Sequence, residues 1–158
     1  MIPWNGAMLF PTYPNCSATT FMLFNEATQQ LENTNIPDLS NTGYSFVAGS
    51  NNDIWSYSGN KLYYYSAAHN EWNLVSLANF PGATVHTIEW DSTNNYLLVY
   101  VYRGGRYGIL GKVTTASYPP SEVTQLLVGG LATYGKVYGV ATSQQQNSDN
   151  FGLPFPLL

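Results

Sequence analysis

Residues 60–77, NKLYYYSAAHNEWNLVSL, decide the fold of this chain. Three consecutive tyrosines lead into the small polar segment Ala67–Asn70, and a tryptophan and further apolar residues follow. Two such runs separated by a short polar segment are typical of a β-hairpin. Because neighbouring side chains of a strand point to opposite faces, Tyr63 and Tyr65 share one face and Tyr64 lies on the other. We therefore predict a strand whose two faces are both covered by neighbouring sheets.

The same pattern continues on both sides of this hairpin. Within residues 44–77 we predict four short strands, YSFVAGS, DIWSYSG, KLYYYSA and EWNLVSL. Residues 85–113 predict a three-stranded meander whose last hairpin turns at Gly104–Gly105, since Gly-Gly supplies the positive φ of a two-residue turn. The segment EVTQLLVGG predicts a fourth strand, and TTFMLFNEATQQLENT predicts an earlier hairpin around Glu26–Gln30.

A short internal similarity suggests how these strands are grouped. Leu23–Leu31, LFNEATQQL, aligns without a gap with Tyr64–Trp72, YYSAAHNEW, at an offset of 41 residues. Periods of about 40 residues with four short strands each are typical of propeller blades. We therefore predict an all-β fold of meander or blade-like antiparallel sheets, resembling a complete or partial β-propeller. A β-sandwich is the alternative.

The end of the chain differs in composition from the rest. We predict a single β domain over residues 1–143, followed over residues 144–158 by a polar linker and the apolar segment FGLPFPLL. Pro154 and Pro156 prevent this tail from continuing a central strand. We expect it to dock on a groove of this chain or of a neighbour. The residues assigned to this assembly tail are Phe151, Phe155, Leu157 and Leu158.

Four segments together resemble a known family: FMLFNEATQQLEN, YSFVAGSNNDIWSYSGNKLYYYS, ATVHTIEWDSTNNYLLVYVYRGGRYGILGKV and ATYGKVYGVA. They are similar to the propeller-like region of Bacteroidetes surface lipoproteins of the PKD-like family, over roughly residues 20–142. The resemblance implies blade hairpins and a place at the cell surface, and it carries over no functional residues. Two features depart from it: Cys16 lacks the apolar lead of a lipoprotein signal, and the length gives fewer than four blades. Because so few blades would not close a propeller, we expect that the chain is part of a larger protein, completes its fold through partners, or is a β-sandwich.

Composition and charge exclude several classes of partner. Charged residues make up 9% of the chain, only five are basic, and the net charge is −4. Nucleic acids and acidic membrane surfaces are held by clusters of cations, so neither is an expected partner. The sequence contains no run of 18 apolar residues, so we predict no membrane-spanning helix. The N-terminus lacks the basic and apolar regions of a signal peptide, and the single cysteine, Cys16, excludes an internal disulfide framework.

Catalytic patterns are scarce. His69 and His86 do not belong to a group of carboxylates or cysteines that would make a convincing zinc site, so we predict no metal site. Glu89 and Asp91 lie on one strand face, but Asp91 opens a turn and is expected to cap its backbone. No nucleophile, phosphate-binding or dinucleotide motif occurs in its proper context. We therefore predict a protein that is not an enzyme and needs no cofactor.

Aromatic residues are the remaining candidates for function. The chain has four tryptophans and 13 tyrosines, which form sugar-stacking platforms and protein hot spots because they combine large contact areas with low side-chain entropy. Packing in the core is the more common role of such aromatic residues, and solvation of a hairpin tip is the more common role of the two arginines. The predicted binding residues are Trp55, Tyr57, Tyr64, Trp72, Arg103 and Arg106.

Two functions from different classes follow. The first is a non-enzymatic binding module, extracellular or at the cell surface, that recognises a carbohydrate or a protein through aromatic surfaces. The second is a structural subunit of a virion, tail or filament, assembled through edge strands and the C-terminal tail. Protein subunits, a homo-oligomer among them, or a surface glycan are the expected partners. A carbohydrate-active enzyme is disfavoured because no pair of facing carboxylates stands out.

Overall fold

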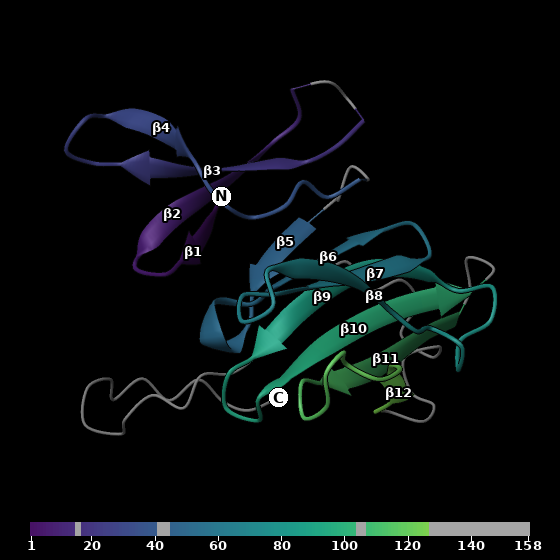
Figure 1. The fold of residues 1–158 in the computed structure, drawn as a ribbon. Coiled ribbons are helices and arrows are strands. Elements are labelled where there is room, and N and C mark those ends of the chain that lie inside the picture. Colours follow the sequence, from purple (N-terminus) through teal and green to yellow (C-terminus); the bar gives the residue numbers. More distant parts are fainter. Residues whose placement is uncertain (15–16, 41–44, 104–106, 127–158) are drawn as a thin grey trace, which may run out of the picture.

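The fold is all-β, as predicted, and consists of three four-stranded antiparallel sheets (Figure 1). The computed structural model describes residues 1–14, 17–40, 45–103 and 107–126. Sheet 1 contains β1 (Ile2–Trp4), β2 (Ala7–Thr12), β3 (Thr20–Asn25) and β4 (Gln30–Asn33). Sheet 2 contains β5 (Ser45–Ala48), β6 (Ile54–Ser58), β7 (Lys61–Ser66) and β8 (Glu71–Val75). Sheet 3 contains β9 (Thr84–Asp91), β10 (Tyr96–Arg103), β11 (Tyr107–Thr114) and β12 (Thr124–Gln125).

Every sheet is a meander in which each strand pairs with the next one in the chain. This confirms the four predicted strands of residues 44–77, the meander that begins near residue 85, and a fourth strand after it. The two aligned segments are the β3–β4 and β7–β8 hairpins, which have matching registers: Phe24 pairs with Leu31, and Tyr65 pairs with Trp72. Apart from the strands, the described residues contain one short 3₁₀ turn, η1 (Ser50–Asn52).

Sheet 2 lies between the other two sheets and is covered on both faces. Tyr63 and Tyr65 join a core cluster with Leu9 and Phe21 of sheet 1. Tyr64, from the opposite face of β7, joins the cluster shared with sheet 3. The predicted alternation of the three tyrosines is therefore confirmed, and it explains why aromatic residues occupy both faces of one strand.

Two core clusters hold the three sheets together. The cluster between sheets 1 and 2 also contains Ile2, Ile36, Leu39 and Ile54. The cluster between sheets 2 and 3 contains, among others, Trp55, Leu62, Val75, Leu97, Val99 and Val101. Full burial of one large apolar side chain contributes roughly 1.5–3 kcal/mol. Packing of sheet on sheet is therefore the main favourable interaction between the three units.

The sheets are arranged as a fan. The first strands of the three sheets are neighbours, since β1 lies against β5 and β5 lies against β9. Among the described strands, the fourth strands β4, β8 and β12 make no comparably close contact from one sheet to the next. The sheets consequently converge at their first strands and diverge toward their last.

Three hairpins share one turn geometry. Asn25, Ser66 and Asp91 end their strands, and each side chain accepts a hydrogen bond from a backbone N–H inside the following four-residue loop. Each loop ends on a residue with left-handed φ, at +57° for Gln29, +52° for Asn70 and +57° for Asn95. A short polar side chain before the loop and a residue that tolerates positive φ at its end therefore specify the turn.

Two details differ from the prediction. Arg103 pairs with Tyr107, so three residues, 104–106, connect β10 to β11 where a two-residue turn was predicted; these residues lie outside the described part of the chain. The β1–β2 hairpin was not predicted. Its turn is Asn5–Gly6, with φ of +49° and +73°, and Asn-Gly is a strong hairpin signal.

The connection from β11 to β12, residues 115–123, crosses back onto sheet 2. Val123 is fully buried, and its N–H donates to the Ser76 carbonyl oxygen at 2.9 Å. Its carbonyl oxygen accepts from the Asn79 side-chain amide, also at 2.9 Å. Val123 Cγ1 would lie 2.6 Å from a Cβ atom at Gly111, so the strand beneath needs a glycine there. This connection ties the outer parts of sheets 2 and 3 together.

Nowhere in the described ranges is there a helix with the length and apolar character needed to cross a bilayer. The predicted boundary at residue 143 lies outside the described residues.

Candidate functional site

Two of the predicted binding residues are core residues, which corrects their assignment to a binding surface. Trp55 is 0% exposed and Tyr64 is 4% exposed, and both lie between sheets 2 and 3. Their ring centroids are 4.6 Å apart. A ligand could reach these rings only if the sheets separated, because strand alternation points both side chains into the sheet-on-sheet contact.

The Tyr64 hydroxyl has a structural partner. It donates a hydrogen bond to Asp53 Oδ2 at 2.5 Å, and Asp53 Oδ1 accepts from the backbone N–H of Ala67 at 2.9 Å. Burial, and then the hydrogen bond to Asp53, raise the pKa of Tyr64 well above its ordinary value. The Tyr64 phenol therefore stays protonated and holds the buried carboxylate at the start of β6 in place.

Tyr57 and Trp72 are partly buried and also bridge segments of the fold. The Tyr57 hydroxyl donates to the His86 carbonyl oxygen at 2.8 Å, which joins sheet 2 to sheet 3. The Trp72 indole N–H donates to the Pro37 carbonyl oxygen at 2.8 Å, and its ring stacks on Phe21 of sheet 1 at 5.5 Å. Both side chains therefore contribute to sheet packing.

Of the remaining predicted site residues, the structure describes Arg103. Arg103 is exposed at the end of β10. Arg106 and the tail residues lie outside the described residues, so their roles stay predictions: Phe151, Phe155, Leu157 and Leu158.

Both histidines and Asp91 have local partners. His69 Nδ1 lies 3.0 Å from Ser66 Oγ, and its ring stacks on Tyr118 at 3.7 Å. His86, on β9, contacts Tyr102 edge to face. Asp91 caps its turn, as predicted, by accepting from the N–H groups of Thr93 and Asn94. Within the described residues, no three His, Cys, Asp or Glu side chains gather as metal ligands would.

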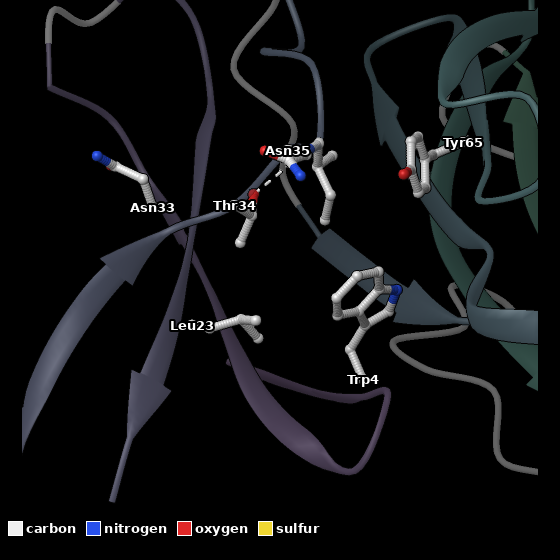
Figure 2. Close-up of a pocket in the computed structure, with 7 residues that line it drawn as sticks. Trp4, Leu23, Asn33, Thr34, Asn35 and Tyr65 are labelled. Carbon is white, nitrogen blue, oxygen red and sulfur yellow. Dashed lines mark hydrogen bonds between the residues drawn. The ribbon is translucent and has the colours of Figure 1, made fainter. Parts of the chain in front are cut away.

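A pocket of about 260 Å³ lies at the seam between sheets 1 and 2 (Figure 2). Figure 2 shows the indole of Trp4 facing the side chain of Leu23, with the ring of Tyr65 beyond Trp4. The segment that follows β4 passes beside them. The lining consists of Trp4, Leu23, Asn33, Thr34, Asn35, Ile36 and Tyr65.

The position of the Trp4 ring is fixed by sheet 2. Its indole N–H donates to the Asn52 carbonyl oxygen at 2.6 Å, across 48 residues of sequence. Asn51 and Asn52 both have left-handed φ, +56° and +62°, a conformation that asparagine tolerates better than most residues. The unusual backbone of η1 thus presents the carbonyl that holds Trp4, whose ring packs against the core between sheets 1 and 2 and also lines the pocket.

Further polar groups of the pocket come from Asn33 at the end of β4, from the link that follows it, and from Tyr65 of β7. The Thr34 hydroxyl donates to the Phe21 carbonyl oxygen at 2.8 Å and accepts from the Ile36 N–H at 3.2 Å, which fixes the path of the link. Asn35 is exposed at the mouth, and Figure 2 shows that the amide of Asn33 points away from Trp4. Among the described residues that line the pocket, the Tyr65 phenol is the only ionisable side chain, so the chemistry of the pocket suits an uncharged ligand.

Sequence reasoning missed this pocket. Its lining comes from β1, β3, β4, the link after β4, and β7, which only the packing of sheet 1 on sheet 2 brings together. The Asn5–Gly6 turn could have placed Trp4 at the end of a strand by sequence alone. No local signal marks Thr34 or Asn35, because asparagine and threonine are common in any connection.

Comparisons with known proteins give no relative: the chain matches no family model, no curated protein and no solved structure.

Proposed function

We propose that the chain is a non-enzymatic binding module that takes an uncharged saccharide in the pocket between sheets 1 and 2, at a cell surface or outside the cell. The observation that carries the proposal is the partly buried Trp4 ring, held in place by Asn52 and placed beside uncharged polar groups. An aromatic face packs against the C–H groups of a sugar ring, while amides bond to its hydroxyls.

The size of the pocket supports a small ligand. At about 260 Å³ it lies just below the range of roughly 300–1,000 Å³ that is typical of sites for drug-sized molecules. One sugar ring, such as the end of a glycan chain, is a ligand of suitable size. Because Trp4 is fixed before binding, little side-chain entropy is lost when the ligand arrives.

The test is a calorimetric titration with neutral mono- and disaccharides. We expect binding that does not change with ionic strength, because none of the described residues that line the pocket carries a charge. Asn35→Ala should weaken it about tenfold, the effect of one lost hydrogen bond of ~1.4 kcal/mol. Asn60→Ala, in the exposed β6–β7 turn, is the matched control and should leave affinity unchanged.

Trp4→Ala should abolish binding while circular dichroism shows that the sheets persist. Binding that survives both Trp4→Ala and Asn35→Ala would place the saccharide elsewhere and refute the proposal. The absence of binding to every neutral sugar tested would also refute it.

A second function, that of a structural subunit, is favoured by a different observation. Sheet 1 carries apolar side chains on the face that points away from sheet 2, and neither core cluster of the described residues includes them. A subunit of a virion, tail or filament would use such a face in assembly.

A further inference from the structure

The outer face of sheet 1 has the composition of a covered face. Strand pairing places Pro3 opposite Met8, Met8 opposite Phe24, and Phe24 opposite Leu31, all pointing away from sheet 2. Phe10 and Met22 continue this face, and Phe10 contacts Phe24 edge to face at 6.4 Å. These six apolar side chains, here called the sheet 1 outer face, are half-buried or exposed, with Leu31 44% exposed.

The sheet 1 outer face also contains a hollow. A depression of about 480 Å³ is lined by Pro3, Gly6, Ala7, Met8, Phe24 and Glu26. Methionine and phenylalanine adapt their shape to an incoming side chain, and an aromatic ring is of a suitable size for this space. A contiguous apolar surface rimmed by polar residues is typical of a protein interaction site.

At the other end of the fan, sheet 3 presents an aromatic face. Tyr96, Tyr102 and Leu110 are half-buried, point away from sheet 2 and belong to neither core cluster of the described residues. On the same face Leu98 and Tyr100 are only 8% and 2% exposed, so they are not available for contact. The acid Glu89 and the base Lys112 flank Leu98 on this face, so their charges offset each other. The half-buried side chains Tyr96, Tyr102 and Leu110 are here called the sheet 3 outer face.

We infer that the sheet 1 outer face binds the sheet 3 outer face of a second copy of this chain, and that such contacts close a ring. This contact would repeat a relation that the chain already contains twice, because sheet 2 packs on sheet 1 and sheet 3 packs on sheet 2 in the same order. The inference goes beyond saccharide binding and does not depend on it.

The fan explains why the assembly closes. A contact between two different surfaces gives a ring when each step rotates about a common axis, and an open filament when it does not. The neighbouring first strands β1, β5 and β9 show that successive sheets already turn about one side of the molecule. In a closed ring each copy uses both outer faces, so the buried area per copy is twice that of a single face.

Light scattering after size exclusion tests the assembly. We expect a single species whose mass is a whole multiple of 17.5 kDa. Phe24→Glu should weaken association by at least ~30-fold, the effect of removing an interface hot spot. Leu74→Glu is the matched control, since Leu74 is a strand leucine of sheet 2 that is 63% exposed and should tolerate a charge.

Mixing two variants tests which faces meet. Phe24→Glu and Tyr102→Glu should each be monomeric alone, and an equimolar mixture should form a heterodimer, because each retains the face that the other needs. If Tyr102→Glu still self-associates and mixing adds nothing, the sheet 1 outer faces bind each other and the inference is wrong. The inference is also wrong if the parent chain is monomeric, or if the mass of the assembly keeps increasing as the protein concentration rises. Circular dichroism of each variant separates loss of contact from loss of fold.

Discussion

Single side chains in this protein act mainly by fixing backbone positions. Asn25, Ser66 and Asp91 each end a strand by accepting hydrogen bonds from the loop that follows. Asp91 is the only one of the three that is ionisable. The Asn94 side-chain amide, followed by backbone N–H groups of the loop, lowers its pKa below the ordinary value of 3.8. The charged form is therefore the one that stabilises the turn.

This shift predicts an acid-dependent stability. A carboxyl whose pKa is lower in the folded than in the unfolded state adds stability that is present above about pH 4 and is lost as pH falls through the folded pKa. Asp91→Asn keeps an acceptor oxygen without the titration. We expect the free energy of unfolding of the parent chain to fall more steeply below about pH 4 than that of Asp91→Asn, measured by denaturant titration. Parallel pH profiles would contradict this role for Asp91.

At the scale of the element, alternation of side chains predicted strands well where both flanking turns were polar. Sheet 2 and the β9–β11 meander were predicted because their aromatic and β-branched runs end at clear turn residues. The β1–β2 hairpin was missed because Pro3 and Pro11 argue against strands. The structure resolves the conflict: pairing with β1 ends at Leu9, so the missing N–H of Pro11 faces no partner strand on that side.

The connection of residues 115–123 is an element whose role the sequence did not show. It contains no alternating pattern, yet Val123 is fully buried against Gly111 and Phe80 lies close to the same glycine. The candidate pocket escaped sequence reasoning for a similar reason, because Trp4, Thr34 and Tyr65 meet only after sheets pack. Contacts between segments distant in sequence are set by packing, which local patterns do not encode.

Removing the buried part of this connection should loosen sheet 2 from sheet 3. Val123→Ala deletes two methyl groups at a closed site, and we expect a loss of about 1–3 kcal/mol in the free energy of unfolding. Leu126→Ala is the control: Leu126 is 38% exposed, and its backbone bond to Leu110 needs no side chain. Denaturant unfolding measures both variants. An equal, small effect for the two would show that the connection is not anchored by Val123.

At the scale of the whole molecule, the position of sheet 2 between two others sets where the structure is most stable. Both core clusters include side chains of β6 and β7, whereas β1, β2 and β3 contribute to one cluster only and β4 contributes to neither. Opening sheet 2 requires both clusters to separate. The unequal burial therefore predicts unequal local stability within one fold.

Hydrogen exchange followed by mass spectrometry measures this gradient. We expect the amides of β6 and β7 to exchange most slowly and those of β1 and β4 to exchange fastest among the strands. Slow exchange depends on how rarely a segment opens, and edge strands covered on one face open most easily. Uniform protection across the three sheets would show instead that they open as one unit.

The shared turn geometry has a practical consequence. What these loops require is an acceptor side chain before them and a left-handed residue at their end, so the exposed positions between are under little constraint from the core. Residues 27–28 and 92–93 are such positions, on different sheets. They are suitable places to graft a short peptide epitope or a fluorophore attachment site, and a pair of labels there would report the spread of the fan by energy transfer.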